Sequence, residues 1–357
     1  CSDSNTCTSC NAGYWLDGIT CMSCPNNCQI CSDSNTCTSC NAGYWLDGIS
    51  CTACEAGKSS SAGSTAITDC LIHLTYTTKA ELQTAVDDWI ALSSKPDLTS
   101  HLHINNWDVS QVTDMEELFK IKTDFNDDIG SWDVSNVTNM DWMFCNAEAF
   151  DQDINSWVVS KVETMVNMFR NAHTFDKDIS SWDVSQVTDM RYMFLNAKSF
   201  NQNIGSWDVS KVTNMDGMFS YARAFDRDIS AWDVSEVTDM NEMFNNAHAF
   251  DQDISSWVVS KVTDMNRMFI EARKFNQDIS SWDVSQVTDM RNMFYRAEKF
   301  NQDISSWNVS KVTYDTDIFT GANALSECNK RTIYDSWKSK NAQLENTLKL
   351  LGWNTYG

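Results

Sequence analysis

The sequence lacks several features on which common protein functions depend. No apolar run approaches the ~18 residues that a membrane-spanning helix needs, so we expect no membrane insertion in this segment. There are only five histidines among 357 residues, and their spacing groups none of them into a site. No G-x-S-x-G, H-E-x-x-H or phosphate-binding glycine loop is present, so we expect that the protein is not an enzyme.

Positive charge is also scarce. The chain has 26 Lys and Arg residues against 49 Asp and Glu residues, which gives a net charge of −23. A field of that sign repels phosphate backbones and anionic lipid headgroups, so we expect no nucleic-acid partner. With 42% hydrophobic residues, the chain can still bury a large core.

Cysteine is abundant at one end and rare elsewhere. The stretch CSDSNTCTSCNAGYWLDG begins at Cys1 and returns at Cys31. The CxxC pairs raise the alternative of zinc, but residues 1–70 hold no histidine, an even number of cysteines and much Gly, Ser and Asn. These features favour disulfides in an oxidising compartment, and their connectivity stays open at this stage. The predicted disulfide cysteines are Cys1, Cys7, Cys10, Cys21, Cys24, Cys28, Cys31, Cys37, Cys40, Cys51, Cys54 and Cys70.

This cysteine spacing resembles the cysteine-rich repeats of growth-factor-receptor and furin-like modules. The resemblance covers about 70 residues. It implies an extracellular rod or spacer and nothing finer.

A second repeat fills the middle of the chain with a fixed period of 25 residues, which indicates a solenoid. In the unit ISSWDVSQVTDMRYMFLNAKSF, residues 179–200, the alternation of Trp182, Asp183 and Val184 predicts a short strand with Asp183 outward. The apolar spacing over residues 190–197 predicts a helical turn, which Thr188 or Asp189 would cap. The tryptophans that mark the period are Trp107, Trp132, Trp157, Trp182, Trp207, Trp232, Trp257, Trp282 and Trp307.

Stacking of these units explains why they repeat, because one coil cannot bury its own apolar residues. We therefore predict an α/β solenoid, a leucine-rich-repeat-like stack of nine 25-residue coils with parallel short strands, helical caps at both ends and a small disulfide-rich N-terminal module. The predicted segments are residues 1–70 for the disulfide-rich repeats, 71–103 for the N-terminal helical cap, 104–319 for the solenoid and 320–357 for the C-terminal helical cap. The first cap would bury Leu82, Val86 and Trp89.

The motif F-[DN]-Q-D-I-S-S-W-D-V-S-x-V-T-D-M-x-x-M-F resembles the repeat of BspA-like leucine-rich-repeat surface proteins, also called the mycoplasma lipoprotein-type repeat. The match covers about residues 104–319. The resemblance implies a secreted or surface-attached, non-enzymatic protein that is used in adhesion and protein contact.

Two columns of carboxylates are candidate contact surfaces. The first, which we name the contact stripe, would lie on the concave face and consists of Asp108, Asp133, Asp183, Asp208, Asp233 and Asp283. It fits a solvated strand surface, and it also fits a surface that binds a ligand. The second column consists of Asp128, Asp153, Asp178, Asp228, Asp253, Asp278 and Asp303, for which Ca²⁺ binding is the alternative. Its spacing is not that of the Gly-rich calcium solenoids, so we expect no cofactor.

Four further residues are candidates for covalent modification. Cys145 and Cys328 lie outside the cysteine-rich segment and too far apart along the stack to pair within one chain. The column of Cys145 looks exposed, which predicts a disulfide between subunits; the alternative is two free thiols, with Cys328 buried in a cap helix. Asn136 and Asn308 begin N-glycosylation sequons in outward columns.

These features favour an extracellular or cell-surface, secreted scaffold with a structural or adhesive role. Its partners would be other proteins, copies of itself, or glycans. The alternative is a subunit of an extracellular filament or appendage that assembles through side contacts of the solenoid. Electron microscopy of native material would separate dispersed particles from ordered fibres.

Overall fold

The computed structural model describes residues 14–17, 20–41, 44–47, 50–53, 74–97 and 102–353. The chain divides into two compact units, residues 1–75 with 94–108 and residues 76–93 with 109–357. No helix among the described residues is long and apolar enough to cross a membrane.

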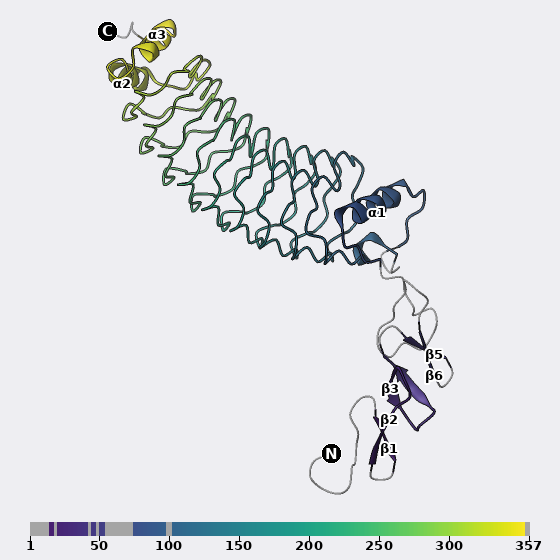
Figure 1. Ribbon diagram of the computed structural model, residues 1–357. Helices are drawn as coiled ribbons and strands as arrows, with labels where there is room; N and C mark the ends of the chain where they lie inside the picture. The colour runs from purple at the N-terminus through teal and green to yellow at the C-terminus, as the bar shows by residue number, and fades with distance from the viewer. Residues whose placement is uncertain are drawn as a thin grey trace. The chain divides into compact units, whose positions relative to one another are not determined.

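The described residues of the first unit form three antiparallel hairpins, coloured purple where drawn in Figure 1. They pair β1 (Tyr14–Asp17) with β2 (Thr20–Ser23), β3 (Cys28–Cys31) with β4 (Cys37–Cys40), and β5 (Tyr44–Asp47) with β6 (Ser50–Ala53). The buried core of the middle hairpin is made of cysteines. Disulfides therefore stabilise this hairpin in place of the apolar core of a larger domain. The short 3₁₀ helix η2 (Ile104–Asn106) also belongs to this unit.

In the second unit the repeats stack in parallel (Figure 1). Isolated parallel bridges join residues 25 apart, from Asp114 with Asn139 to Asp289 with Tyr314. Alternate backbone N–H groups add a ladder between repeats. Those of Met190 and Tyr192, for example, donate to carbonyls of the following repeat at 3.1 and 2.8 Å. The predicted stacking of successive repeats is confirmed.

The strand expected at residues 182–184 and the helical turn expected at residues 190–197 are both wrong. The described repeats contain bridges and turns but neither strands nor helices, so an α/β composition of the stack is wrong as well. Tyr192 and Asn196 have φ angles of 57° and 58°, in the left-handed region that a right-handed helix excludes. Their N–H groups bind the next repeat instead of a carbonyl of their own turn. The apolar positions of the expected helix are nevertheless buried.

The core of the stack consists of columns of identical side chains. The Trp, Val, Ile, Met and Phe positions of successive repeats are buried, and Phe194 stacks on Phe219 of the next repeat with ring centroids 5.7 Å apart. Each inward tryptophan also has a polar contact: Nε1 of Trp207 donates to the carbonyl of Ile179 in the preceding repeat at 3.1 Å. Burial of the indole therefore leaves no unpaired N–H group.

Helices cover both ends of the stack. Helix α1 (Lys79–Ala91) buries Leu82, Val86 and Trp89, as predicted, and begins with a capping box at Thr78. Helices α2 (Glu327–Trp337) and α3 (Ala342–Leu350) follow the last repeat. Trp337 of α2 continues the column of repeat tryptophans, because its ring stacks on that of Trp307 with the centroids 6.2 Å apart. Its Nε1 also donates to the carbonyl of an isoleucine, as the repeat tryptophans do.

Candidate functional site

The contact stripe is exposed along the second unit. Asp133, Asp183, Asp208, Asp233 and Asp283 each lie between a buried tryptophan and a buried valine, as the alternating pattern predicted. Asp108 belongs to the other unit, where it is half-buried and accepts a hydrogen bond from Thr75 Oγ1 at 3.3 Å.

The column is not acidic throughout. Val158 and Val258 take the place of aspartate and are 54% and 55% exposed, and Asn308 takes it in a later repeat. The stripe thus presents rows of carboxylate interrupted by single apolar side chains.

Hydrogen bonds within each repeat hold the stripe carboxylates in place. Oδ1 of Asp208 accepts from the backbone N–H of Ser210 at 3.1 Å, and Asp233 and Asp283 make the same contact at 3.0 Å. Hydrogen bonds from the serine hydroxyl and backbone lower the pKa values of all three carboxyls. The stripe is therefore an ordered row of fixed negative charges, with an interval of about 4.8 Å between neighbouring repeats.

The second carboxylate column has the same local geometry. Asp178 and Asp278 each accept from the N–H group two residues later at 2.9 Å, and serine hydrogen bonds lower the pKa of both. An open polar hollow lies between Asp278 and Asp303, and another between Asp128 and Asp153. In the described residues, the groups of three or more ligand atoms close enough to share an ion come from cysteines and not from these carboxylates. The Ca²⁺ alternative therefore gains no support from this column.

Six of the predicted disulfide cysteines form three disulfides in the first unit. The pairs are Cys24–Cys31, Cys28–Cys37 and Cys40–Cys51. Cys1, Cys7, Cys10, Cys54 and Cys70 lie outside the described residues, as does the side chain of Cys21.

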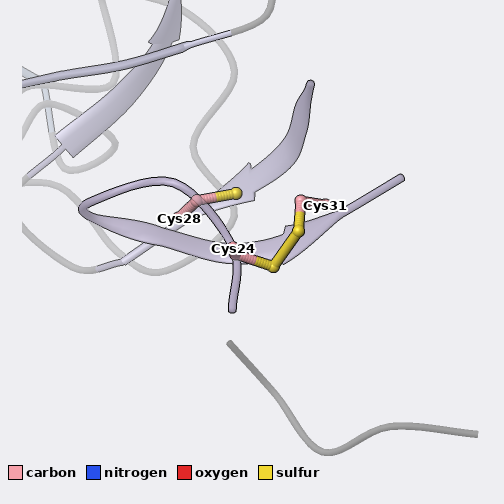
Figure 2. Close-up of side chains that lie close together, drawn as sticks. All are labelled: Cys24, Cys28 and Cys31. Atoms are coloured by element: carbon pink, nitrogen blue, oxygen red, sulfur yellow. A yellow bond between two sulfur atoms is a disulfide. The ribbon is translucent and has the colours of Figure 1, made fainter. Parts of the chain in front are cut away.

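The zinc alternative has a geometric basis but lacks the chemistry. Figure 2 shows the Cys24–Cys31 disulfide beside the sulfur of Cys28. The three sulfur atoms lie close enough together to hold one ion if all three were thiolates. Zinc binds the thiolate form of cysteine, and a disulfide sulfur is no longer a thiolate. Disulfides persist in oxidising compartments, so this segment belongs outside a reducing cytosol.

The predicted exposure of Cys145 is wrong. Its side chain is 1% exposed, and burial raises the pKa of the thiol. Lys120 and Arg170 occupy the same column in the flanking repeats, and both extend over the ring of Trp142. Long neighbours therefore enclose a short side chain in a column that looks exposed from its residue types. The alternative of a buried Cys328 is also wrong, because that thiol is exposed on α2.

The two sequons differ in accessibility. Asn136 is half-buried, and its Nδ2, the atom that a glycan would modify, donates to the carbonyl of Ser110 at 2.9 Å. Asn308 is exposed, and its Oδ1 accepts from the N–H of Ser310 at 3.3 Å. Glycosylation of either stays a prediction, and the folded chain favours Asn308.

Sequence reasoning missed a polar cluster around the buried Asp216 in the middle of the stack. The hydroxyl of Tyr192 donates to Asp216, and Nδ2 of Asn241 donates to the other carboxylate oxygen of Asp216 at 2.9 Å. Gly217 makes this possible, because a Cβ there would lie 2.4 Å from the Tyr192 ring. The signal was available: Gly217 is the one glycine in a column whose other members, 25 residues apart, are Glu117, Trp142, Asn167, Tyr192, Glu242, Arg267, Asn292 and Asp317.

Comparison with known proteins identifies the repeat and nothing beyond it. Residues 92–202, 170–273 and 253–348 match a family described as Mycoplasma protein of unknown function, DUF285. A search of the curated proteins gives no match, and neither does a search of the solved structures. Because the matched stretches together span residues 92–348, well over half of the sequence, the chain belongs to the DUF285 family.

Proposed function

We propose that the protein is an extracellular, non-enzymatic scaffold with a structural or adhesive role. The repeats would form a nine-coil solenoid of the BspA-like type that presents its acidic surface to other proteins. The disulfide-rich segment would act as a spacer, and glycans would be a further class of partner.

The observation that carries this proposal is the geometry of the contact stripe. Asp183, Asp208 and Asp233 stand on three successive repeats, and each is held by the N–H group two residues later. A charge that is already oriented loses little conformational entropy on binding, so such a row suits contact with a complementary cationic surface. The exposed Val158 and Val258 add apolar contact area within the same column.

The compartment proposed for the protein rests on the cysteines. Three disulfides in a segment with little apolar core are typical of secreted modules. Display at a cell surface is the further step of this proposal, and it agrees with the resemblance of the repeat motif to surface proteins.

The second candidate function is a subunit of an extracellular filament or appendage. It is favoured by four exposed cations that have neither an ion-pair nor a hydrogen-bond partner within the described part of the chain: Lys198, Arg223, Lys274 and Lys299. Cations left free on a protein of net charge −23 are suited to an acidic neighbour.

A site-specific crosslinker tests the proposal. Val158 is the best position for a photoreactive amino acid, because it lies in the same column as the stripe carboxylates, is exposed and has an apolar side chain that forms no hydrogen bond. Ile121, which is 63% exposed and outside the stripe, is the control. Illumination of native surface material should give protein adducts from position 158 and few from position 121. Equal yields from both positions, or none from position 158, would refute the proposal. Electron microscopy of the same material would separate dispersed particles from fibres.

A further inference from the structure

Most cations in the described part of the repeat stack and its N-terminal cap have a partner within the chain. Lys79 pairs with Glu116 at 3.1 Å, and Lys261 pairs with Glu236 at 2.6 Å. In other repeats an amide takes the place of the acid, as where Lys211 donates to Gln186 at 2.8 Å. The cations without a partner are therefore the exceptions.

These exceptions share one position in the fold. Lys198 and Arg223 occupy one column, and Lys274 and Lys299 occupy the column directly after it. Both columns form the two-residue turn between a buried alanine and a buried phenylalanine, and all four side chains are exposed. Arg273, half exposed at 50%, lies in the same turn and reaches Glu271 and Glu298. We name this set the basic ridge: Lys198, Arg223, Arg273, Lys274 and Lys299.

The basic ridge and the contact stripe have matching geometry. Both run along the same stack, so their charges recur at the same interval of about 4.8 Å per repeat or at multiples of it. From Lys198 to Lys299 the ridge extends over four repeat steps, or about 19 Å. Asp183, Asp208 and Asp233 cover two such steps without interruption. A second copy of this stack presents carboxylates at the same fixed interval as the cations of the ridge. A flexible polyanion has no fixed interval between its charges.

The two surfaces cannot meet within one chain. In each repeat the buried Phe200, Ile204 and Trp207 positions and the turn at residues 205–206 separate them. The hydrogen bonds between repeats hold every coil in this arrangement.

We propose that the basic ridge of one molecule docks on the contact stripe of a second copy of this chain. The proposal rests on the proposed function of the stripe as a protein-contact surface, and it names the partner. Ion pairs between Lys or Arg and the oriented carboxylates would set the register of the two stacks. The apolar Val158 and Val258 would lie within the same contact.

Sedimentation velocity of the full chain tests this, in 20 mM and 500 mM NaCl. The ridge variant is Lys274→Ala with Lys299→Ala, which follows the alanines already present in that column at Ala224 and Ala249. Its control is Lys211→Gln with Lys261→Gln, which removes the same charge in a column that already holds Gln186 and Gln286.

The stripe variant is Asp208→Asn with Asp233→Asn, prepared like all the proteins compared in a host without N-glycosylation, because each change creates an Asn-Val-Ser sequon. Asn308 shows that asparagine keeps the local hydrogen bond in this column. Tryptophan fluorescence during urea unfolding should first confirm that all the variants remain folded.

We expect the wild type to self-associate at low salt and to dissociate at high salt, because salt screens exposed ion pairs. The ridge variant and the stripe variant should each weaken association by about tenfold or more, since each removes two charges from the contact. The control should associate at least as strongly as the wild type, because Lys211 and Lys261 lie near the stripe carboxylates Asp208 and Asp233 and not on the ridge. A mixture of the ridge and stripe variants should associate more strongly than either variant alone, because one intact contact remains between them.

Two results would overturn this inference. One is a wild type that stays monomeric at low salt at every concentration tested. Binding of heparin to the ridge of such a monomer would not rescue the inference. The other is a loss of association in the control equal to that in the ridge variant. If the wild type is monomeric while position 158 still crosslinks to other proteins, the inference fails and the proposed function stands. If position 158 captures nothing, the proposed function fails too.

Discussion

Replacement of Asp216 by asparagine should change the pH dependence of stability in a way that the burial of this residue dictates. Asp216 is 9% exposed and accepts hydrogen bonds from the Tyr192 hydroxyl and Asn241 Nδ2. Burial raises the pKa of its carboxyl to about 6, with the charge of Asp239 adding to the shift and the two donors opposing it. The folded chain therefore favours the protonated form more than the unfolded chain does.

The sign and magnitude follow from linkage. With a folded pKa of about 6 and an unfolded pKa of about 3.9, Asp216 imposes no penalty below pH 3.9. The penalty grows to about 1.5 kcal/mol at pH 5 and about 3 kcal/mol at pH 8. Asparagine has one acceptor oxygen for two donors, so the variant should lose about 1 kcal/mol at every pH. The net change in unfolding free energy is then close to zero at pH 5 and about +2 kcal/mol at pH 8. Asn241 and Asn266 in the same column indicate that the amide fits.

Urea unfolding followed by tryptophan fluorescence at several pH values between 5 and 8 measures this difference. Asp208→Asn is the matched control of opposite sign, because the pKa of Asp208 is lowered in the folded chain. A lowered pKa contributes stability that is present above the unfolded pKa and is lost as the pH falls through the folded pKa. That variant should thus be slightly less stable than wild type at pH 8. A difference between Asp216→Asn and wild type that stays constant within about 0.5 kcal/mol from pH 5 to 8 would refute the argument.

Three further perturbations test other parts of the structure. Trp207→Ala should lower the unfolding free energy by about 3–5 kcal/mol, because it opens a cavity and leaves a carbonyl of the preceding repeat without its donor; a loss under about 1 kcal/mol in urea unfolding would contradict its place in the core. Gly217→Ala should lower the unfolding free energy by about 1–3 kcal/mol, because residue 217 has a φ of 57° and a Cβ there would clash with the Tyr192 ring. Adding Tyr192→Ala removes the clash and should recover part of this loss, so additive effects of the two changes in urea unfolding would contradict the clash. On a denaturing gel without reductant, any disulfide-linked ladder should disappear in Cys328→Ser and persist in Cys145→Ser, since only the former thiol is exposed; the reverse pattern would show that the buried thiol is reached.

The sequence was sufficient for features that depend on the repeat itself. The period of the tryptophans predicted that successive repeats stack, and the alternation around Trp182 predicted that Asp183 faces outward. Helix α1 and its buried face were likewise predictable, because Leu82, Val86 and Trp89 follow helical spacing. Cysteine content predicted disulfides, but only the three-dimensional arrangement reveals their pairing.

The local conformation of residues 190–197 was not predictable from apolar spacing. Met190, Met193, Phe194 and Ala197 match a helical stripe, and a stack of turns buries the same four positions. The helix and the stacked turns differ in the carbonyl groups that accept hydrogen bonds from the backbone N–H groups. In the stack these acceptors belong to the neighbouring repeat, which lies alongside every coil and so replaces the carbonyls of a helical turn.

The sequence alone determined that identical residues would lie over one another, because a fixed period leaves stacking as the way to bury the apolar positions. Only the tertiary structure decided which polar groups are enclosed and which are free. Cys145 is buried because its neighbours in adjacent repeats are long, and Asp216 is buried because a tyrosine from the preceding repeat lies over Gly217. Within the described part of the chain Lys274 and Lys299 have no ion-pair partner, although Glu298 of the repeat after Lys274 pairs with Arg273. These outcomes depend on side chains 25 residues away in the sequence, which come into contact only when the coils stack.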